Sequence, residues 1–405
     1  MAPLPPPTAF PEESAVSSPP LPRGLLVYGA YGYTGRLVVE EALRQGIRPV
    51  LAGRDPHRLE AVAREVSPDA PLPFRVASLD DPRELARALD GIHTVLHAAG
   101  PFVHTAPAML GVCLARRVHY IDLTGEVPVF ELAFDLAEEA KETGIVLLPG
   151  AGMDVVPTDS AAVRAAADCP GATRLEIGLH SPGPLSRGTR RTIAEHAADG
   201  LLVRRDGRLV PANPGDPEFL PAIHFDPAAP PVPVLPYTWG DLSTAWRSTG
   251  IPHITCYMAA SRSTRAILPA TLPLLRGVLS TRGGQALAHV LARRGPDGPS
   301  SRDRNEVRVR AWARATAPDG RTAQVILETP EAYRFTAMAA VALAGVVGNG
   351  GLEPGTRTPA EALGSRWILG LPGVHMVHRS QGGPPGLRKT QAGPPSFVPP
   401  AEESM

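Results

Sequence analysis

The chain has 405 residues, which is enough for two domains that each bury a hydrophobic core. Lysine plus arginine total 40 and aspartate plus glutamate total 40, so the formal net charge is zero. This balance supplies no overall attraction for phosphate backbones or anionic lipid, and we expect no nucleic-acid partner.

The two ends of the chain differ in composition from its middle. Residues 1–22 and 380–405 are rich in proline, glycine and serine, and we expect disordered tails there because such segments bury too little apolar surface to fold. The first tail lacks the apolar stretch of a signal peptide. The longest membrane-like run, Phe335 to Val347, is much shorter than the ~20 residues of a spanning helix. We therefore expect a cytoplasmic protein with no spanning membrane segment.

Residues 23–150 alternate between short apolar runs and helical segments. This alternation predicts right-handed crossovers and a parallel sheet, which together make a Rossmann-type α/β domain. The expected strands are Leu25–Tyr28, Pro49–Ala52, Phe74–Ala77, Thr94–Ala98, Tyr120–Leu123 and Ile145–Leu148. The helices between them are expected up to about Gln45 and over Pro56–Val66, Pro82–Leu89, Ala106–Arg116 and Val129–Thr143.

After this domain the pattern changes, and residues 151–350 predict a second α+β domain with a mixed or antiparallel sheet. One strand is expected near Leu175–His180. The apolar helix Tyr333–Val347 and the segment 351–379 are expected to pack back onto the first domain.

A β-hairpin is expected late in the second domain. The run Val307 to Arg314 alternates strongly, with apolar residues at its odd-numbered positions. The turn Asp319-Gly320 then leads to a second run, Ala323–Leu327. The pattern predicts two paired strands with one buried face.

A glycine-rich turn, Gly29 to Gly35, separates the first strand from the first helix. Backbone N–H groups of such a turn can approach a phosphate without interference from Cβ atoms, and the helix N-terminus adds a favourable dipole. Its position in a βαβ unit predicts dinucleotide binding. The residues expected to contact the cofactor there are Gly29, Tyr31, Gly32, Tyr33, Thr34 and Gly35.

The second strand ends at Gly53-Arg54, where NAD-binding domains usually carry an acid for the ribose hydroxyls. An arginine suits the 2′-phosphate of NADP instead, so Arg54 predicts NADP as the cofactor. A solvated arginine is the alternative interpretation, and the neighbouring Asp55 leaves NAD open.

Two further positions in the first domain are expected near the cofactor. Asp80 follows the third strand and is placed for the adenine edge, with a solvated loop acid as the alternative. Ala99 and Gly100 follow the fourth strand, and their small side chains would let the dinucleotide approach the backbone at the carboxyl edge of the sheet. Tight packing of that turn is the alternative.

Polar residues also follow the last two strands of the first domain. Asp122 and Asp154 are candidate catalytic acids at the nicotinamide end of the crevice, although helix capping or turn formation would explain either one. Tyr120 is a candidate proton donor.

The sequence gives little support for catalysis by a cysteine, a lysine or a metal ion. Cys113, Cys169 and Cys256 are odd in number and far apart, so we expect three reduced, buried thiols. The only lysines, Lys141 and Lys389, lie in a charged helical stretch and in the C-terminal tail, where neither suits acid–base work. The histidines lack metal-ligand spacing, and we expect no metal site.

The motifs YGAYGYTGRL, LAGRD, HAAGPF, HYIDLTGE and PGAGMDVVPTD occur in that order. Together they resemble the saccharopine dehydrogenase-like NADP-binding oxidoreductases, which include trans-acting enoyl reductases. The likeness continues through LSRGTRRT, WGDLSTAWRSTGIP and GTRTPAEALG and covers about residues 24 to 375. It implies NADP(H), a Rossmann domain joined to an α/β substrate domain, and often a homodimer. Gly29, Gly32, Gly35 and Arg54 match the family's cofactor positions.

These features predict an NADP(H)-dependent oxidoreductase that reduces a C=C, C=O or C=N bond of a small acyl or amino-acid-like compound. The proton would come from Tyr120, an acid or water. The alternative is a non-catalytic NADP(H)-binding regulatory or scaffold protein. A neutral or monoanionic substrate is favoured over saccharopine because several buried carboxylates would need paired cations. Four arginines could still supply that charge: Arg187, Arg190, Arg191 and Arg247.

Overall fold

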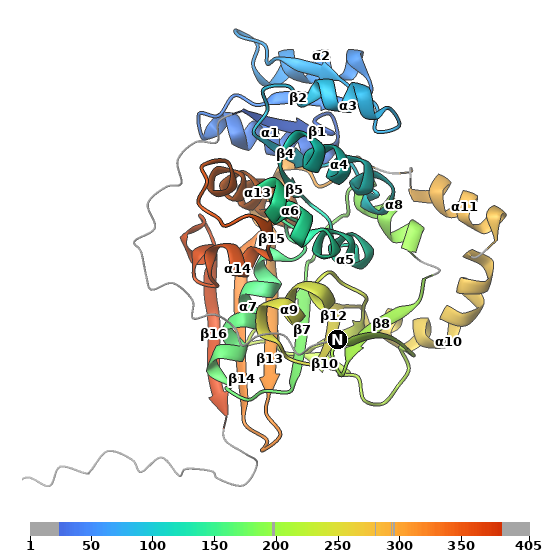
Figure 1. The fold of residues 1–405 in the computed structure, drawn as a ribbon. Coiled ribbons are helices and arrows are strands. Elements are labelled where there is room, and N and C mark those ends of the chain that lie inside the picture. The colour runs from blue at the N-terminus through green and yellow to red at the C-terminus, as the bar shows by residue number, and fades with distance from the viewer. Residues whose placement is uncertain (1–23, 197–198, 280, 293, 295, 383–405) are drawn as a thin grey trace, which may run out of the picture.

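The first domain is built on a parallel sheet of seven strands in the order β15-β6-β5-β4-β1-β2-β3 (Figure 1). The computed structural model describes residues 24–382 except 197–198, 280, 293 and 295. Val27 packs with Val38 on one face of this sheet and Leu26 lies in the core cluster of the other face, so both faces are buried as in other parallel sheets. The strands are β1 (Leu25–Tyr28), β2 (Val50–Gly53), β3 (Phe74–Val76), β4 (Thr94–His97), β5 (His119–Asp122), β6 (Val146–Leu148) and β15 (Gly355–Thr356).

Six helices connect these strands, and their starts follow local capping rules. Asp55 and Asp81 accept hydrogen bonds from backbone N–H groups of the turns that they precede, and a proline follows each of them in the first turn. The helices are α1 (Tyr33–Arg44), α2 (Pro56–Val66), α3 (Pro82–Ala88), α4 (Phe102–Arg116), α5 (Val127–Asp135) and α6 (Ala137–Thr143).

Two of the expected helices have different bounds in the structure. Helix α4 begins at Phe102 instead of Ala106, because the carboxylate of Glu126 accepts hydrogen bonds from the first two N–H groups of the helix. The single helix expected over Val129–Thr143 is two helices, because Leu136 leaves helical geometry at φ −87° and ψ 6°.

The second domain carries a mixed sheet, which confirms the predicted fold class. Its main path is β10-β11-β12-β7-β13-β14-β16, in which only β12 and β7 are parallel neighbours, and the hairpin β8–β9 pairs with β12. The strands are β7 (Arg174–His180), β8 (Leu201–Arg205), β9 (Arg208–Ala212), β10 (Ala222–Ile223), β11 (Val232–Pro236), β12 (His253–Ala259), β13 (Arg308–Thr316), β14 (Thr322–Pro330) and β16 (His375–Gly382). The helical segments are α7 (Val156–Asp168), α8 (Arg187–His196), α9 (Asp241–Thr249), α10 (Arg262–Leu279), α11 (Arg282–Ala292), α12 (Ser301–Glu306), α13 (Ala332–Gly348), α14 (Pro359–Leu363) and η1 (Trp367–Gly370).

The predicted hairpin is confirmed as β13 and β14, but both of its faces are covered. The apolar odd-numbered residues of β13 are buried, as expected. Trp312 and Ile326 on the opposite face are buried too, in a cluster with Phe225. Because the segment around β8–β11 covers this face, Arg310 extends to an ion pair with Asp226 instead of into solvent.

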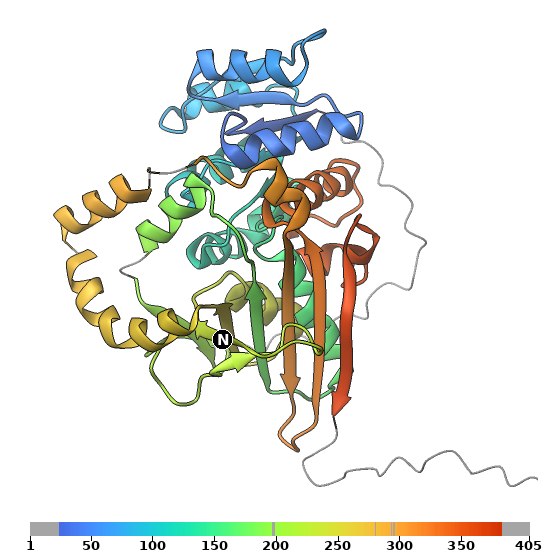
Figure 2. The ribbon, with the colours of Figure 1, turned by 180° about the vertical axis from the view of Figure 1, so that it is seen from behind.

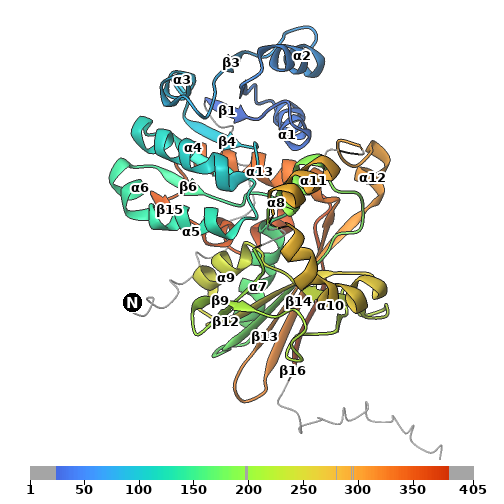
Figure 3. The ribbon, with the colours of Figure 1, turned by 90° about the vertical axis from the view of Figure 1, so that its right-hand side faces the viewer.

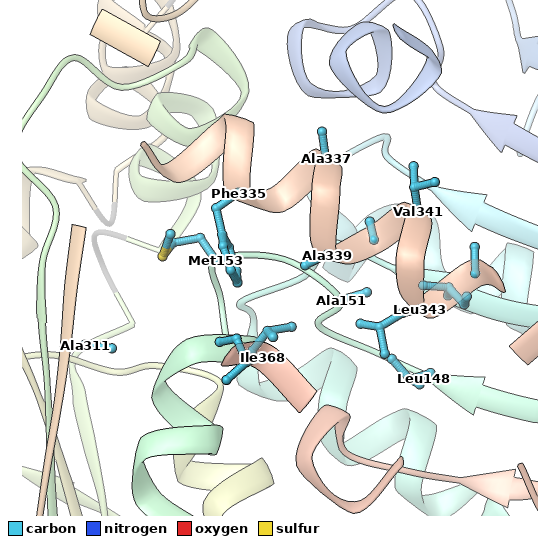
Figure 4. Packing of buried hydrophobic residues seen from close by; sticks show 14 of the residues in the cluster. Leu148, Ala151, Met153, Ala311, Phe335, Ala337, Ala339, Val341, Leu343 and Ile368 are labelled. Carbon is cyan, nitrogen blue, oxygen red and sulfur yellow. The ribbon is translucent and has the colours of Figure 1, made fainter. Parts of the chain in front are cut away.

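Helix α13 joins the two domains. It is buried along most of its length and contacts α1, β4 and β5 of the first domain as well as β14 of the second. Figure 4 shows Phe335 and Leu343 of this helix pointing toward the segment that contains Met153 and Leu148. The expected packing of this helix onto the first domain is confirmed. Through these contacts the helix connects the first sheet to the second sheet.

The C-terminal segment also belongs to both domains. Strand β15 pairs in parallel with β6, so residues beyond 350 complete the first sheet. Strand β16 continues to Gly382, which pairs with Thr322. The expectation of disorder from residue 380 is therefore wrong for residues 380–382, since Ser380 and Gln381 also pair with β14. The remainder of that tail and the tail expected over residues 1–22 lie outside the described residues.

Candidate functional site

The glycine turn follows β1 at the carboxyl edge of the first sheet. Gly29 has φ +83°, a conformation that residues with a Cβ rarely adopt. A Cβ on Gly35 would lie 2.2 Å from the carbonyl oxygen of Gly29, so Gly35 lets α1 pack against the turn. A Cβ on Gly32 would meet only that same carbonyl oxygen, at 3.2 Å, so the outer side of the turn is open.

The start of α1 suits a phosphate group. Gly32 is the N-cap and provides no side-chain hydrogen bond, and the first turn carries no acidic residue. The helix dipole and the N–H groups of this turn therefore have no competing anion of their own. The residues fit the pyrophosphate of a dinucleotide, as the sequence predicted.

A tyrosine and two arginines surround the end of β2. The ring of Tyr31 fills the space in front of Gly53, where a Cβ would come within 2.6 Å of the ring. The guanidinium of Arg58 lies over this ring, 4.3 Å from its centre, and donates a hydrogen bond to the Tyr31 carbonyl. Arg54 is exposed at the end of β2, and its assignment to the 2′-phosphate stays a prediction.

The other residues expected at the cofactor have distinct surroundings. Asp80 is exposed and accepts a hydrogen bond from Ser78, so its position favours the alternative of a solvated loop acid. Tyr33 points into the second domain, where its hydroxyl donates to the Pro299 carbonyl at 2.6 Å. Its ring packs edge-on against Tyr333. Tyr33 therefore connects the glycine turn to the second domain through this hydrogen bond and ring contact.

A large pocket of about 870 Å³ extends from the carboxyl edge of the first sheet into the second domain. Thr34 of the glycine turn, Gly100 after β4 and Leu123 after β5 line its end in the first domain. Ala99 lies between the lining residues Ala98 and Gly100, and its carbonyl accepts a hydrogen bond from the hydroxyl of Thr105. The far end is lined mostly by apolar side chains, among them Leu185, Ile193, Leu202, Leu235, Met258 and Leu268.

Asp154 is the predicted acid that reaches this pocket. It follows β6 and lies against Gly125, where an added Cβ would come within 2.8 Å of the carboxylate oxygen Oδ2. Its carboxyl forms no hydrogen bond within the described residues. Burial raises the pKa of Asp154 to about 7, so a large fraction carries a proton at neutral pH.

Tyr120 and Asp122 do not line the pocket. Tyr120 is fully buried within the first domain, and its hydroxyl donates to Asp122 Oδ2 at 2.7 Å. Asp122 Oδ1 accepts from the backbone N–H groups of Thr124 and Gly150. Burial raises the pKa of Asp122 to about 6. The two residues tie together the loops that follow β5 and β6, and their catalytic roles stay predictions.

Sequence reasoning missed an ion pair that crosses the pocket. Glu126 is almost fully buried and lies 3.3 Å from His196 Nε2 of α8. Burial would raise the pKa of Glu126, but His196 and two N–H groups of α4 outweigh it and hold the pKa low. The same carboxylate raises the pKa of His196 to about 9, helped by Asp199. No local signal could have shown this pair, because its members come from different domains.

Tyr237 and Trp239 also line the pocket and were not predicted. Their rings pack edge-on with centres 5.4 Å apart. Burial and the nearby Asp154 raise the pKa of Tyr237 to about 12, so its hydroxyl keeps its proton. The indole N–H of Trp239 is buried without a hydrogen-bond partner within the described residues.

The arginines considered for substrate carboxylates are mostly paired within the protein. Both terminal nitrogens of Arg247 bond to the carboxylate of Glu131, and its guanidinium stacks on the Phe134 ring at 3.8 Å. Arg187 pairs with Asp297, and the guanidinium of Arg190 donates to three backbone carbonyls. None of these three lines the pocket within the described part of the chain.

The fold and the pocket define a two-domain dinucleotide-binding protein in which the second domain closes over the carboxyl edge of a Rossmann sheet. Residues 25–148 match the family described as the saccharopine dehydrogenase NADP binding domain. The predicted resemblance is therefore confirmed over the first domain, and the matched family model describes an NADP-binding domain, in agreement with the predicted cofactor.

Curated relatives are similar over the same part of the chain. A "Probable mitochondrial saccharopine dehydrogenase-like oxidoreductase" of Arabidopsis thaliana is 31% identical over 149 residues, and a "Trans-acting enoyl reductase" of Mycobacterium ulcerans is 30% identical over 139 residues. Each match covers 33% of this chain and 33% of the relative, so only about a third of either relative's length is compared.

A solved structure is similar over most of the chain. Apo saccharopine dehydrogenase (L-Glu forming) of Saccharomyces cerevisiae matches with a TM-score of 0.59 and 12% identity. The match covers 89% of this chain and 100% of the yeast chain. At this identity the match shows a shared fold, including the second domain, and leaves the substrate undetermined.

Proposed function

We propose that the protein is an NADPH-dependent reductase of an apolar, neutral or monoanionic compound with a polarised C=C, C=O or C=N bond. The observation that carries the proposal is the pocket of about 870 Å³, which begins at the glycine turn and ends among apolar side chains. NADPH would supply a hydride. The residues of this chain would bind the cofactor, orient the substrate and exclude water.

Asp154 is the proton donor in this proposal. Its carboxyl faces the pocket beside the carboxyl ends of β5 and β6, and burial raises its pKa to about 7. A neutral carboxyl can deliver a proton to the carbon, oxygen or nitrogen that becomes electron-rich during reduction. Tyr237 keeps its proton at the same pH and is placed to hold a polar group of the substrate.

The charge of the pocket argues against a substrate with several carboxylates. Among the described residues that line the pocket, His196 is the one cation, and it lies beside Glu126 and Asp199. That cation is already neutralised, so further carboxylates would be desolvated without partners, at a cost of several kcal/mol. An acyl chain would instead contact the leucine-rich end of the pocket.

The test is NADPH oxidation with a panel of enoyl and keto thioesters and imines, followed by mass-spectrometric detection of products two hydrogens heavier. NADP⁺ reduction with saccharopine is measured at matched concentration. We expect turnover with an acyl compound and none with saccharopine. Turnover with saccharopine would overturn the substrate class. Tight NADPH binding without turnover of any compound would favour a regulatory protein.

A further inference from the structure

Two consecutive helices, α10 and α11, expose an apolar surface. Figures 2 and 3 show them along the outer side of the second domain, in orange, beside α8. Their large exposed side chains include Ile267, Val278, Leu287, Val290 and Leu291, which are 47% to 58% exposed. We call α10 and α11 the arm.

The exposed side chains form stripes at helical spacing. In α11, Leu287, Val290 and Leu291 are separated by three and four positions and therefore share one face. In α10, Ile267 and Val278 are eleven positions apart, which is close to three full turns. Helix α11 therefore presents an apolar stripe outward, and the two exposed aliphatic residues of α10 lie on one side of that helix.

The charge of the arm departs sharply from that of the whole chain. The full sequence is neutral, but no aspartate or glutamate occurs between Arg262 and Arg294. Arg262, Arg265 and Arg282 form no ion pair within the described residues. Free arginines beside exposed aliphatic side chains make a basic amphipathic surface.

We propose that the arm lies on an anionic lipid surface. Aliphatic side chains would enter the headgroup boundary, while the arginines would contact lipid phosphates. A second copy of the chain is a poorer occupant, because a two-fold contact would bring the same unpaired arginines face to face. None of the described helices is long and apolar enough to cross a bilayer, so the contact would remain at the surface.

The arm also leads to the pocket. Helix α11 contacts α8, and Ile193 of α8 and Leu268 of α10 both line the pocket. Ile193 is 38% exposed, so an apolar side chain of the pocket lining is also accessible on the helix that α11 contacts. This part of the argument rests on the proposed function: an apolar substrate would pass from the lipid into the reductase without crossing water.

Vesicle flotation with the full-length chain tests the proposal. We compare phosphatidylcholine vesicles with vesicles that also contain phosphatidylglycerol, at low and high salt. We expect binding to the anionic vesicles, weakened by salt because the arginine contribution is screened. Absence of binding to anionic vesicles would overturn the proposal, as would binding that ignores lipid charge.

Variants locate the contact. The double variant Leu287→Glu/Leu291→Glu should bind at least about tenfold more weakly, since it places charge in the apolar stripe. Val377→Glu, on an exposed residue of β16, is the matched control and should bind like wild type. Arg265→Glu/Arg282→Glu provides a second loss-of-binding variant if the first one melts early. Equal binding by wild type and both double variants would refute the assignment to the arm.

Two more measurements separate the alternatives. Turnover of a short, water-soluble substrate should be unchanged in Leu287→Glu/Leu291→Glu, because neither residue lines the pocket. Vesicle binding without any reductase activity would leave the lipid contact standing and reject the proposed function. Sedimentation that shows an arm-dependent dimer, or capture of an acidic carrier protein without vesicle binding, would overturn the lipid proposal.

Discussion

At the scale of single residues, Gly32 is the position at which an added side chain is expected to clash with the cofactor while making almost no contact with the protein. A Cβ there has only one close protein neighbour, so the space in front is available to the pyrophosphate. We expect Gly32→Asp to abolish NADPH binding, because it adds both bulk and negative charge. Fluorescence titration measures the loss, and circular dichroism checks the fold. Unchanged affinity would show that the dinucleotide binds elsewhere.

Arg54 tests cofactor choice. Its side chain is exposed at the end of β2 beside the stack of Arg58 on Tyr31. We expect Arg54→Ala to weaken NADPH roughly tenfold to a hundredfold and to leave NADH almost unaffected, since one charge-assisted bond to phosphate contributes about 1.5–3 kcal/mol. Isothermal titration with both cofactors makes the comparison. An equal loss for both would assign Arg54 to the fold.

Asp154 tests the proposed proton donor. Because the neutral form donates and its pKa is about 7, we expect kcat to fall as the pH rises through about 7. Asp154→Asn should lower kcat roughly 10²–10⁴-fold and remove this decline while NADPH affinity is retained. Gly125→Ala should act in the same direction by displacing the carboxyl that it contacts. A pH profile that Asp154→Asn leaves unaltered would reject the assignment.

At the scale of elements, the packing of α7 against α9 buries a carboxyl group. Asp159 accepts hydrogen bonds from Ser248 and from the backbone N–H of Ala360, and burial raises its pKa to about 7. The usual value is 3.8, so the folded state binds more protons than the unfolded state between these pH values. Folding stability therefore falls as the pH rises from about 4 to 7.

This burial predicts a pH-dependent effect of Asp159→Asn. The amide cannot ionise, so the variant should gain stability relative to wild type as the pH rises from 5 to 8, by roughly 1–4 kcal/mol. Urea unfolding at both pH values measures the difference. Asp168 lies on the same helix and pairs with Arg379, which lowers its pKa, so Asp168 is ionised in both the folded and the unfolded state from pH 5 to 8. The control Asp168→Asn should therefore differ from wild type in stability by the same amount at both pH values. If the urea midpoints of wild type and Asp159→Asn changed by the same amount between pH 5 and pH 8, the prediction would be contradicted.

At the scale of the whole molecule, distant segments complete each domain. Helix α13 lies against the first sheet, and β15 extends that sheet from the other end of the chain. The arm adds a surface on which arginines lie beside exposed apolar side chains, although the net charge of the whole chain is zero. Neither domain is therefore a continuous stretch of sequence, and the first 150 residues alone lack part of the core that they use.

Truncations test this interdependence. Deleting residues 1–20 and 383–405, which lie outside the described residues, should leave the melting temperature and NADPH affinity unchanged, because their composition offers no apolar face. Extending the C-terminal deletion back to His375 removes β16 from β14 and should lower the melting temperature by several degrees. Differential scanning fluorimetry compares the two. A decrease with the shorter deletion would mean that a tail contacts the folded protein.

The sequence alone determined the features that depend on neighbouring residues. Glycines in the turn, apolar runs of strand length and prolines at helix starts act over a few positions, so the Rossmann domain and the edge that carries the glycine turn could be predicted from pattern. The role of Arg54 stays a prediction. The mixed second sheet was predicted for the same reason, since its hairpin alternates along the chain. Asp154 was predicted because residues after parallel strands gather at one edge.

Tertiary structure decided which of these polar groups reach the pocket. Tyr120 and Asp122 stand at the same sheet edge as Asp154, but they bond to each other inside the domain. Glu126 meets His196 only because the second domain folds over the sheet, and Arg247 is engaged by Glu131 for the same reason. Contacts between residues this far apart depend on how the domains pack, and that packing is the sum of many weak apolar contacts that no local pattern records.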